Sequence, residues 1–268
     1  QQLQQELEMQ LTNKLVLVTG ATGGIGRALC ALLSAAGARL VLNGLVETQL
    51  RELQQQLGPQ HQIAVADISA MEGREGLEQV CQQAGGVDVV INLAGILDCN
   101  LYTNQSEAAI SRLMDVNAVA PMLLTRRLLP QLLQKPHARI VNVGSTFGSI
   151  GHPGFATYCA SKAAMKMFSE ALARELADTG VSVGYIAPRA TNTPLNTDRI
   201  ILLNQALGNA TDTPEQVAME VFALVLSKAR LRYLGWPEAL FVRINAVLPG
   251  VVHNALVKKL PLIKQILG

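Results

Sequence analysis

Short apolar runs alternate with longer helical patterns along most of this 268-residue chain, and this alternation is the feature that most constrains its fold. The runs that we expect to be strands are Leu15–Thr19, Leu40–Leu42, Ile63–Val65, Val87–Asn92, Arg139–Gly144 and Val181–Ile186, and the expected helices are Gly24–Ala36, Val46–Leu57, Ala108–Gln134, Tyr158–Asp178 and 214–227. Strands that are apolar almost throughout are typical of a parallel sheet covered by helices on both faces. Right-handed crossovers between them predict a doubly wound α/β fold.

No internal repeat or low-complexity linker divides the chain, so we expect one domain, at residues 14–236, after an N-terminal extension at 1–13. Residues 237–268 are expected to form a basic, amphipathic C-terminal extension. From Leu226 onward seven Lys or Arg side chains stand against Glu238 alone, a charge of 7 − 1 = +6, whereas the whole chain carries +2. A helix of this kind either lies on an anionic membrane surface as a peripheral contact or packs on the domain or on a second subunit.

Composition disfavours several classes of function. A net charge of +2 and an aromatic content of 4% provide neither a basic field nor a stacking platform for nucleic acid. The cysteines Cys30, Cys81, Cys99 and Cys159 lack metal-binding spacing, so we expect reduced, buried thiols and no metal site. No run of 18 apolar residues occurs, and the first ten residues do not resemble a signal peptide, so we expect a cytoplasmic protein or one at the inner membrane face.

A glycine-rich turn, Thr19-Gly20-Ala21-Thr22-Gly23-Gly24-Ile25-Gly26, follows the first expected strand and opens the first expected helix. Glycines let the backbone turn sharply and approach a pyrophosphate closely, and the N-terminus of a helix carries a partial positive charge. A glycine-rich turn alone is a weak signal, but its place between the first strand and the first helix predicts a dinucleotide site.

Tyr158 and Lys162 form the second chemical signal, because residues four apart share one face of a helix. A nearby ammonium favours the phenolate, so this pair is expected to lower the tyrosine pKa and to make a proton donor that works near neutral pH. Ser145 ends the fifth expected strand, at the edge of the sheet where such folds bind ligands. Asn92 ends the fourth strand, and Asn117 lies within an expected helix.

In this combination the chain resembles the short-chain dehydrogenase/reductase family, in its single-domain branch, from about Lys14 to Leu234. The resemblance implies a Rossmann-like sheet of about seven strands, a nicotinamide cofactor and a homodimer or homotetramer formed through the two long helices. The matching pieces are Thr19–Gly26, Asp67, Asn92–Gly95, Asn117, Ser145, Tyr158, Lys162 and residues 188–193.

The resemblance also implies a catalytic tetrad of Asn117, Ser145, Tyr158 and Lys162. Ser145 would hydrogen-bond the substrate carbonyl, Tyr158 would donate the proton, and Lys162 would hold the nicotinamide ribose. Asn117 would position a water that connects Lys162 to solvent. The cofactor contacts implied in the same way are Gly20, Thr22, Gly23, Gly24, Ile25, Gly26, Asp67, Ile68, Asn92, Ala94, Gly95, Tyr158, Lys162, Pro188, Thr191 and Thr193; for Asp67, an N-cap of a helix near Ser69 is the alternative.

The chain departs from the family pattern in three places. No carboxylate that would hold a ribose 2′-hydroxyl occupies position 44, where Gly44 stands, and no arginine follows it, so Asn43 is the expected donor to a 2′-phosphate and NADP is favoured over NAD. Arg189 stands where the family has glycine, and we expect it to avoid positive φ and to face the active site. The usual Asp-Gly-Gly after the last strand is absent.

The apolar segment Leu195–Gly208, with Leu97, Phe147 and Phe155, indicates either an apolar wall for the substrate pocket or packing in the core. We therefore expect an oxidoreductase that interconverts a carbonyl and a secondary alcohol on a small, hydrophobic or lipid-like molecule. The alternatives are a 3-oxoacyl-thioester reductase of fatty-acid type and a non-catalytic dinucleotide-binding sensor or scaffold. The presence of both Tyr158 and Lys162 argues against the last of these.

Overall fold

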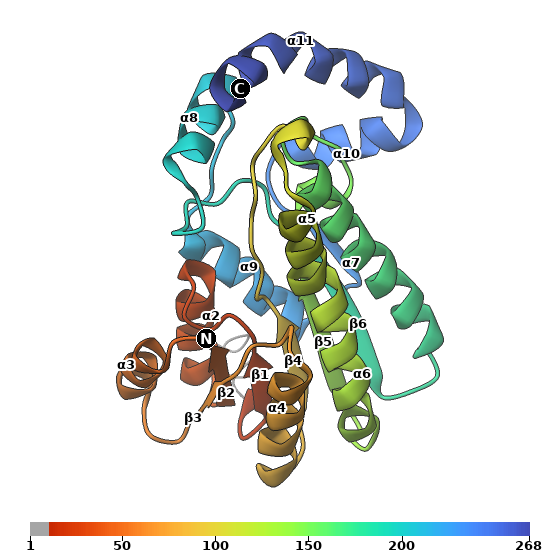
Figure 1. The fold of residues 1–268 in the computed structure, drawn as a ribbon. Coiled ribbons are helices and arrows are strands. Elements are labelled where there is room, and N and C mark those ends of the chain that lie inside the picture. Colours follow the sequence, from red (N-terminus) through yellow and green to blue (C-terminus); the bar gives the residue numbers. More distant parts are fainter. Residues whose placement is uncertain (1–10) are drawn as a thin grey trace.

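The computed structural model describes residues 11–268, and their strands form one parallel sheet in the order β3-β2-β1-β4-β5-β6-β7 (Figure 1). The predicted doubly wound sheet is confirmed, including its seventh strand. The strand order reverses direction between β1 and β4, which is where open α/β sheets bind ligands. The strands are β1 Leu15–Val18, β2 Arg39–Gly44, β3 Gln62–Val65, β4 Val89–Asn92, β5 Ala138–Val143, β6 Val181–Ala187 and β7 Leu231–Tyr233.

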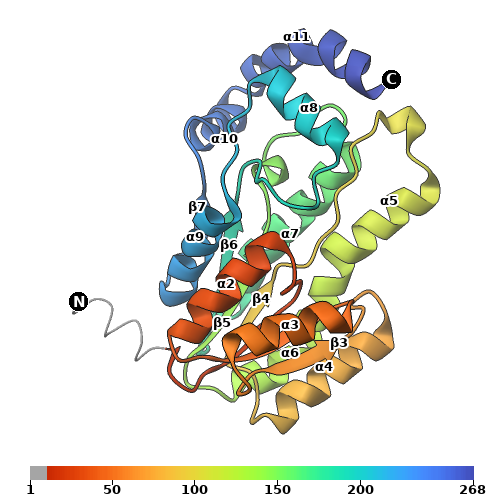
Figure 2. The same cartoon turned by 90° about the vertical axis from the view of Figure 1, so that its left-hand side faces the viewer.

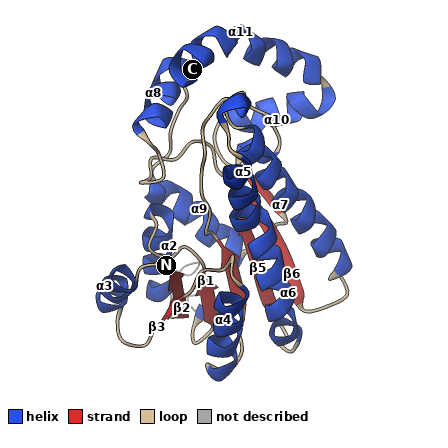
Figure 3. Cartoon of the chain, viewed as in Figure 1, coloured by secondary structure: helices blue, strands red, loops and turns tan. Residues whose placement is uncertain are grey.

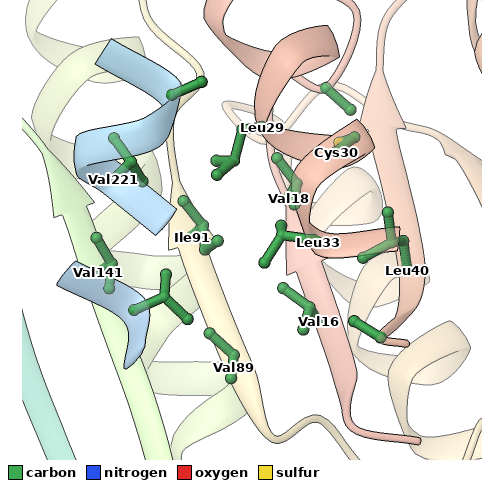
Figure 4. Packing of buried hydrophobic residues seen from close by; sticks show 14 of the residues in the cluster. Val16, Val18, Leu29, Cys30, Leu33, Leu40, Val89, Ile91, Val141 and Val221 are labelled. Atoms are coloured by element: carbon green, nitrogen blue, oxygen red, sulfur yellow. The ribbon is translucent and has the colours of Figure 1, made fainter. Parts of the chain in front are cut away.

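Helices cover both faces of the sheet, in three layers (Figures 1 and 3). One apolar cluster joins the sheet to α2, α3 and α9, and Figure 4 shows Leu29 and Leu33 of α2 packed against Val16, Val18 and Ile91 of the strands. A second cluster joins the other face to α4, α6 and α7. The helices are α2 Gly24–Ala35, α3 Glu47–Leu57, α4 Met71–Gln83, α5 Glu107–Met114, α6 Ala120–Leu133, α7 Ala156–Glu175, α8 Asp198–Leu207, α9 Pro214–Leu226, α10 Glu238–Val247 and α11 Pro249–Leu267.

Helix α4 was not among the helices expected from the sequence, which offered a helix start near Ser69 only as the alternative role of Asp67. Gly73 and Gly76 weaken its helical pattern, because glycine is a poor helix former. The structure forms the helix nonetheless, since Leu77 and Cys81 are buried against the sheet. Tertiary packing thus outweighs local propensity here. All four cysteines are free and buried, as predicted.

The helical stretch predicted over Ala108–Gln134 is divided by a π-helical turn, Asp115–Val119, between α5 and α6. Neither of its prolines ends a helix. Pro121 lies in the first turn of α6, where a missing N–H costs little, and Pro130 lies inside the helix. Helix α7 ends at Glu175, and α9 begins with a capping box in which the Thr213 hydroxyl accepts from the N–H of Gln216 and the Gln216 side chain accepts from the N–H of Thr213.

The C-terminal helices gather with α8 at one end of the molecule, beyond the carboxyl ends of the strands (Figures 1 and 2). Helix α11 continues through Pro261 and buries Val252, Ile263 and Leu267. The second alternative for this segment, packing on the domain, therefore describes it. No helix within residues 11–268 is long and apolar enough to cross a membrane. Of the predicted N-terminal extension, residues 1–10 lie outside the described residues, while Leu11 is buried in the core.

Candidate active site

The turn between β1 and α2 requires glycine for two different reasons. Gly20 has a φ of +68°, and a Cβ at this position would lie 2.9 Å from the Cα of Ala94. At Gly26, a Cβ would overlap the carbonyl oxygens of Gly20 and Ala21. The turn therefore packs so closely against the helix and against the loop at Ala94 that neither position has room for a side chain.

The N-terminus of α2 fits an anion such as a pyrophosphate. Its N-cap, Gly23, supplies no side-chain acceptor, and its first turn contains no acidic residue. The first N–H groups of the helix, from Gly24 and Ile25 onward, lack acceptors within the helix. Thr22 precedes them, and its Oγ1 is 3.2 Å from the position that a Cβ at Gly44 would take. The residues predicted for dinucleotide phosphates thus lie together at this helix N-terminus, with the side chains of Pro194 and Pro214 close to Gly24.

Asn43 does not have the role predicted for it. Its side chain is buried, and its Nδ2 donates to the carbonyl oxygens of Ala64 and Ala66, 3.0 Å away in each case. The amide joins β2 to β3 and the residue after it, because an unpaired amide in the sheet would be costly. It is therefore not free to reach a 2′-phosphate.

Asp67 follows β3, and its carboxylate is occupied by protein groups. Its Oδ1 accepts from the N–H of Ser69 at 2.9 Å and from the Ser69 hydroxyl at 2.6 Å, while its Oδ2 lies 3.5 Å from the Arg112 guanidinium. The hydrogen bond from the Ser69 hydroxyl, followed by the other contacts, holds the pKa of Asp67 below its ordinary value. Asp67 is not the N-cap of α4, which is Ala70. The side chain of Ile68 is buried in the core, which leaves its backbone as the part that can contact a cofactor.

The end of β4 is held by a polar network inside the protein. Asn92, predicted to contact the cofactor, is buried, and its Nδ2 donates to the Oδ1 of Asn142 at 2.8 Å and to the Oγ1 of Thr125 at 3.2 Å. The Oγ1 of Thr19 accepts from the N–H of Leu93 at 3.0 Å and from that of Ala94 at 3.1 Å. The side chain of Asn92 therefore ties β4 to β5 and α6, and Thr19 fixes the loop that faces the glycine turn.

Asn117 lies in the π-helical turn, a distortion that often accompanies functional sites. Its side chain exchanges two hydrogen bonds with the backbone of Ile96, at 2.8 and 2.9 Å, and its Nδ2 also donates to Ser161 Oγ at 3.2 Å. A Cβ at Gly95 would lie 3.2 Å from Asn117 Oδ1 and 3.6 Å from Lys162 Nζ. The amide of Asn117 therefore holds the loop after β4 against Lys162.

Ser145 follows β5 in extended conformation and caps the short 3₁₀ helix at residues 146–148, where its Oγ accepts from the N–H of Phe147 at 3.1 Å. Tyr185, from the neighbouring strand β6, was missed by the sequence analysis. Its hydroxyl oxygen is 3.3 Å from each of Ser145 N, Ser145 O and Lys162 O. A Cβ at Gly144 would overlap this hydroxyl. The only sequence signal was a bulky tyrosine in a strand of otherwise small or aliphatic residues.

Tyr158 and Lys162 lie one turn apart on α7, with Lys162 Nζ 5.6 Å from the centre of the Tyr158 ring. Burial raises the pKa of Tyr158 to about 12, opposed by a hydrogen bond with Ser145. Burial also lowers the pKa of Lys162 to about 8. The sequence predicts a lowered Tyr158 pKa, and the structure gives the opposite direction because desolvation outweighs the favourable contacts around the phenol.

A cavity of about 380 Å³ lies over Ser145, Tyr158 and Lys162. This volume is in the range of small-molecule sites. The structure thus brings together the three predicted residues that carry the proton chemistry. The other walls of the cavity come partly from the loop after β6, through Pro188, Thr191 and Thr193. The rest is formed by apolar side chains from other parts of the chain: Leu97, Phe147, Phe155, Ile200, Val252 and Leu256.

Arg189 also lines this cavity, but its guanidinium is paired. Its Nη2 and Nε donate to Asp212 Oδ1 at 2.7 and 3.0 Å, and its Nη1 donates to Glu238 Oε2 at 3.2 Å. Arg189 avoids positive φ, as predicted. Through its ion pair with Glu238, Arg189 connects the loop after β6 to α10.

Comparison with known proteins agrees with this geometry. The family model described as short chain dehydrogenase matches residues 14–200. Nodulation protein G of Rhizobium sp. (strain N33) is 38% identical over 180 residues, which cover 67% of this chain and 74% of that protein. The 3-oxoacyl-[acyl-carrier-protein] reductase of Vibrio cholerae is 31% identical over 240 residues, covering 87% and 94%. The crystal structure of a 3-ketoacyl-(acyl-carrier-protein) reductase from Brucella melitensis complexed with NADH superposes with a TM-score of 0.75 at 25% identity, covering 82% and 96%.

Proposed function

The chain belongs to the short-chain dehydrogenase family and is an oxidoreductase that uses a nicotinamide dinucleotide; from this premise we propose that it interconverts a carbonyl group and a secondary alcohol on an apolar, lipid-like small molecule. The observation that carries the proposal is the position of Ser145, Tyr158 and Lys162 at the base of a cavity whose walls are largely apolar. When bound, the nicotinamide supplies or accepts the hydride.

The residues of the chain handle the proton and the orientation of the substrate. Ser145 Oγ donates a hydrogen bond to the substrate oxygen, and the Tyr158 hydroxyl delivers the proton to the same oxygen. Burial raises the Tyr158 pKa to about 12, so the phenol is protonated at neutral pH and can donate its proton when a carbonyl is reduced. Lys162 lies against the loop at Gly95 and is the residue that would hold the ribose next to the nicotinamide.

Replacement of the tyrosine tests this assignment. Tyr158→Phe removes the proton donor and keeps the ring, so we expect it to retain the fold and dinucleotide binding while turnover falls about 10²–10⁴-fold. Turnover is measured by the loss of reduced-nicotinamide absorbance with a panel of ketones, and binding by fluorescence titration. A Tyr158→Phe variant with full activity would show that the phenol is not the donor.

The preference for NADP over NAD remains part of the proposal, on a narrower basis than the sequence suggested. With Asn43 committed to the sheet, the supporting feature is the bare position Gly44 at the end of β2, where no carboxylate repels a 2′-phosphate and the Thr22 hydroxyl is close by. Comparing kcat/KM for NADPH and NADH tests this choice. A preference for NADH would overturn it.

A second candidate, reduction of 3-oxoacyl thioesters, is favoured by the similarity to the acyl-carrier-protein-linked reductases of Vibrio cholerae and Brucella melitensis. Acetoacetyl thioesters therefore belong in the substrate panel beside simple apolar ketones. Activity with the thioesters alone would select this candidate. Dinucleotide binding without turnover on any carbonyl would instead select the non-catalytic sensor.

A homodimer or homotetramer also remains a proposal, as does a small-molecule substrate of hydrophobic character. Several apolar side chains are exposed on the π-helical turn, α6 and α7, the long helices from which assembly was expected: Val119, Leu123, Leu133 and Met167. Sedimentation-velocity measurement of the molecular mass tests the assembly, and a purely monomeric protein would refute it.

A further inference from the structure

Helix α11 presents a lysine to the active-site cavity on its inward face. Val252, Ile263 and Leu267 of this face are buried, and Leu256 lines the cavity. Lys259 comes seven residues after Val252 and four before Ile263, so it shares their face. Like Leu256, Lys259 lines the cavity. A cation on the apolar stripe of an amphipathic helix is unexpected, because such a stripe normally faces a core.

The neighbouring lysines of α11 point elsewhere. Lys258 and Lys264 lie one residue and five residues away from Lys259, on the flanks of the helix, and neither lines the cavity. The structure thus separates Lys259 from the other two lysines of this helix. This separation gives Lys259 a matched control, since Lys258 lies on the same turn and is exposed like Lys259 but does not line the cavity.

Lys259 is also the cation of the cavity wall that is neither catalytic nor paired within residues 11–268. Arg189, which lines the same cavity, is paired with Glu238 at 3.2 Å and with Asp212 at 2.7 Å, and Lys162 belongs to the catalytic group. Lys259 lies close enough to His152 for its charge to help lower the pKa of that imidazole, which burial lowers most. Apart from the catalytic end, Lys259 is thus an unpaired positive charge in the cavity wall formed by the described residues.

An aromatic wall connects the two ends. The ring of Phe147 is 6.4 Å from that of Tyr158, in an edge-on arrangement, and 5.1 Å from that of His152, on which it is stacked. His152 is in turn the group whose pKa the charge of Lys259 helps to lower. From the reacting hydroxyl to the lysine, the wall therefore offers mainly apolar surface.

The helical segment that carries Lys259 is attached to the rest of the protein at both of its ends. Asn245 Nδ2 of α10 donates to the carbonyl oxygen of Ser149 at 2.9 Å. At the other end, Ile263 and Leu267 join a cluster with Phe155 and Ile200, and Leu267 packs closely over Gly154. Figures 1 and 2 show α11 running from α10 to α8 as an arch.

We propose that the substrate is an amphiphile, with its carbonyl at Ser145 and Tyr158, an apolar chain along the aromatic wall, and an anionic group that pairs with Lys259. This inference rests on the proposed function, because it describes the other end of the same substrate. A carboxylate at the end of the chain or a phosphate of a phosphopantetheine thioester supplies the same charge, and both are included in the test.

The test measures kcat/KM for oxo-carboxylic acids of graded chain length, for their uncharged methyl esters, and for a 3-oxoacyl phosphopantetheine thioester. The wild-type protein is expected to prefer the anion over the ester at one chain length. Lys259→Met should reduce this preference roughly twofold to fivefold through KM, as expected for a solvent-screened ion pair. Lys259→Glu should reverse it, whereas Lys258→Met and Lys258→Glu should leave it unchanged.

The outcomes distinguish this inference from the proposed function. If the wild-type protein reduces acids and esters equally and Lys259→Glu leaves reduction of the thioester unchanged, or if the Lys259 and Lys258 variants behave alike, the pairing with Lys259 is refuted while carbonyl reduction stands. If no carbonyl compound is reduced by any variant, the proposed function itself fails. Preference for the thioester over the acid, lost in Lys259→Glu, would identify phosphate as the source of the charge; the converse would identify the carboxylate.

Discussion

Removing the Lys162 ammonium should change the stability of the protein in a pH-dependent way. Burial lowers the pKa of Lys162 from 10.5 to about 8, so the native state disfavours the charged form relative to the unfolded chain. At 1.36 kcal/mol per pH unit, this difference corresponds to about 3 kcal/mol. Below pH 8 both states carry the proton and the native state bears the full cost. Between pH 8 and 10.5 the unfolded chain binds more protons, so the free energy of unfolding contributed by Lys162 rises with pH.

Lys162→Met keeps the length of the side chain and removes its charge. The variant should therefore gain stability relative to the wild-type protein at pH 7, and this gain should shrink by about 3 kcal/mol by pH 10.5. Urea unfolding followed by circular dichroism at several pH values measures the difference, and other titrating groups cancel between the two proteins. Lys258→Met, at an exposed position, is the control and should show a constant difference. A constant difference for Lys162→Met as well would refute a cost of burying the charge.

Three further substitutions test how the site is held. Gly26→Ala places a Cβ against the carbonyl of Gly20; we expect a loss of about 1–3 kcal/mol in thermal or urea unfolding and weaker dinucleotide binding, and an unchanged dissociation constant would contradict the close packing. Tyr185→Phe leaves the N–H of Ser145 without its acceptor, so kcat should fall while KM for the dinucleotide stays constant. A fall in kcat accompanied by an equal rise in this KM would point to general misfolding instead. Arg189→Met leaves the carboxylates of Asp212 and Glu238 without their shared cation and releases α10 from the loop after β6. We expect the free energy of unfolding to fall by about 1–3 kcal/mol and the substrate KM to rise, as measured by unfolding and steady-state kinetics. An unchanged substrate KM would mean that α10 does not shape the cavity.

Local patterns predicted most of the sheet and the chemical end of the site. The glycine turn, the capping box at Thr213 and the pair Tyr158 and Lys162 depend on short-range geometry, so their spacing in the sequence carries the information. Helix α4 was missed because its stability comes from burial of Leu77 and Cys81 rather than from propensity.

The roles of single polar residues were harder to predict. Asn43 and Asn92 were expected at the cofactor, and both instead satisfy buried backbone or side-chain groups of neighbouring strands. The direction of the Tyr158 pKa was wrong for a related reason: charge is visible in the sequence, while desolvation depends on what covers the phenol.

The sequence by itself determined the parallel sheet, the glycine-rich turn and the helical pair of phenol and amine, because each depends on residues close together in the chain. Only the tertiary structure decided what encloses them. Tyr185 reaches Ser145 from another strand, and α11 returns from the far end of the chain to close the cavity with Lys259 on its inner face. Such contacts join residues distant in sequence, and packing rather than local pattern selects which side chains meet.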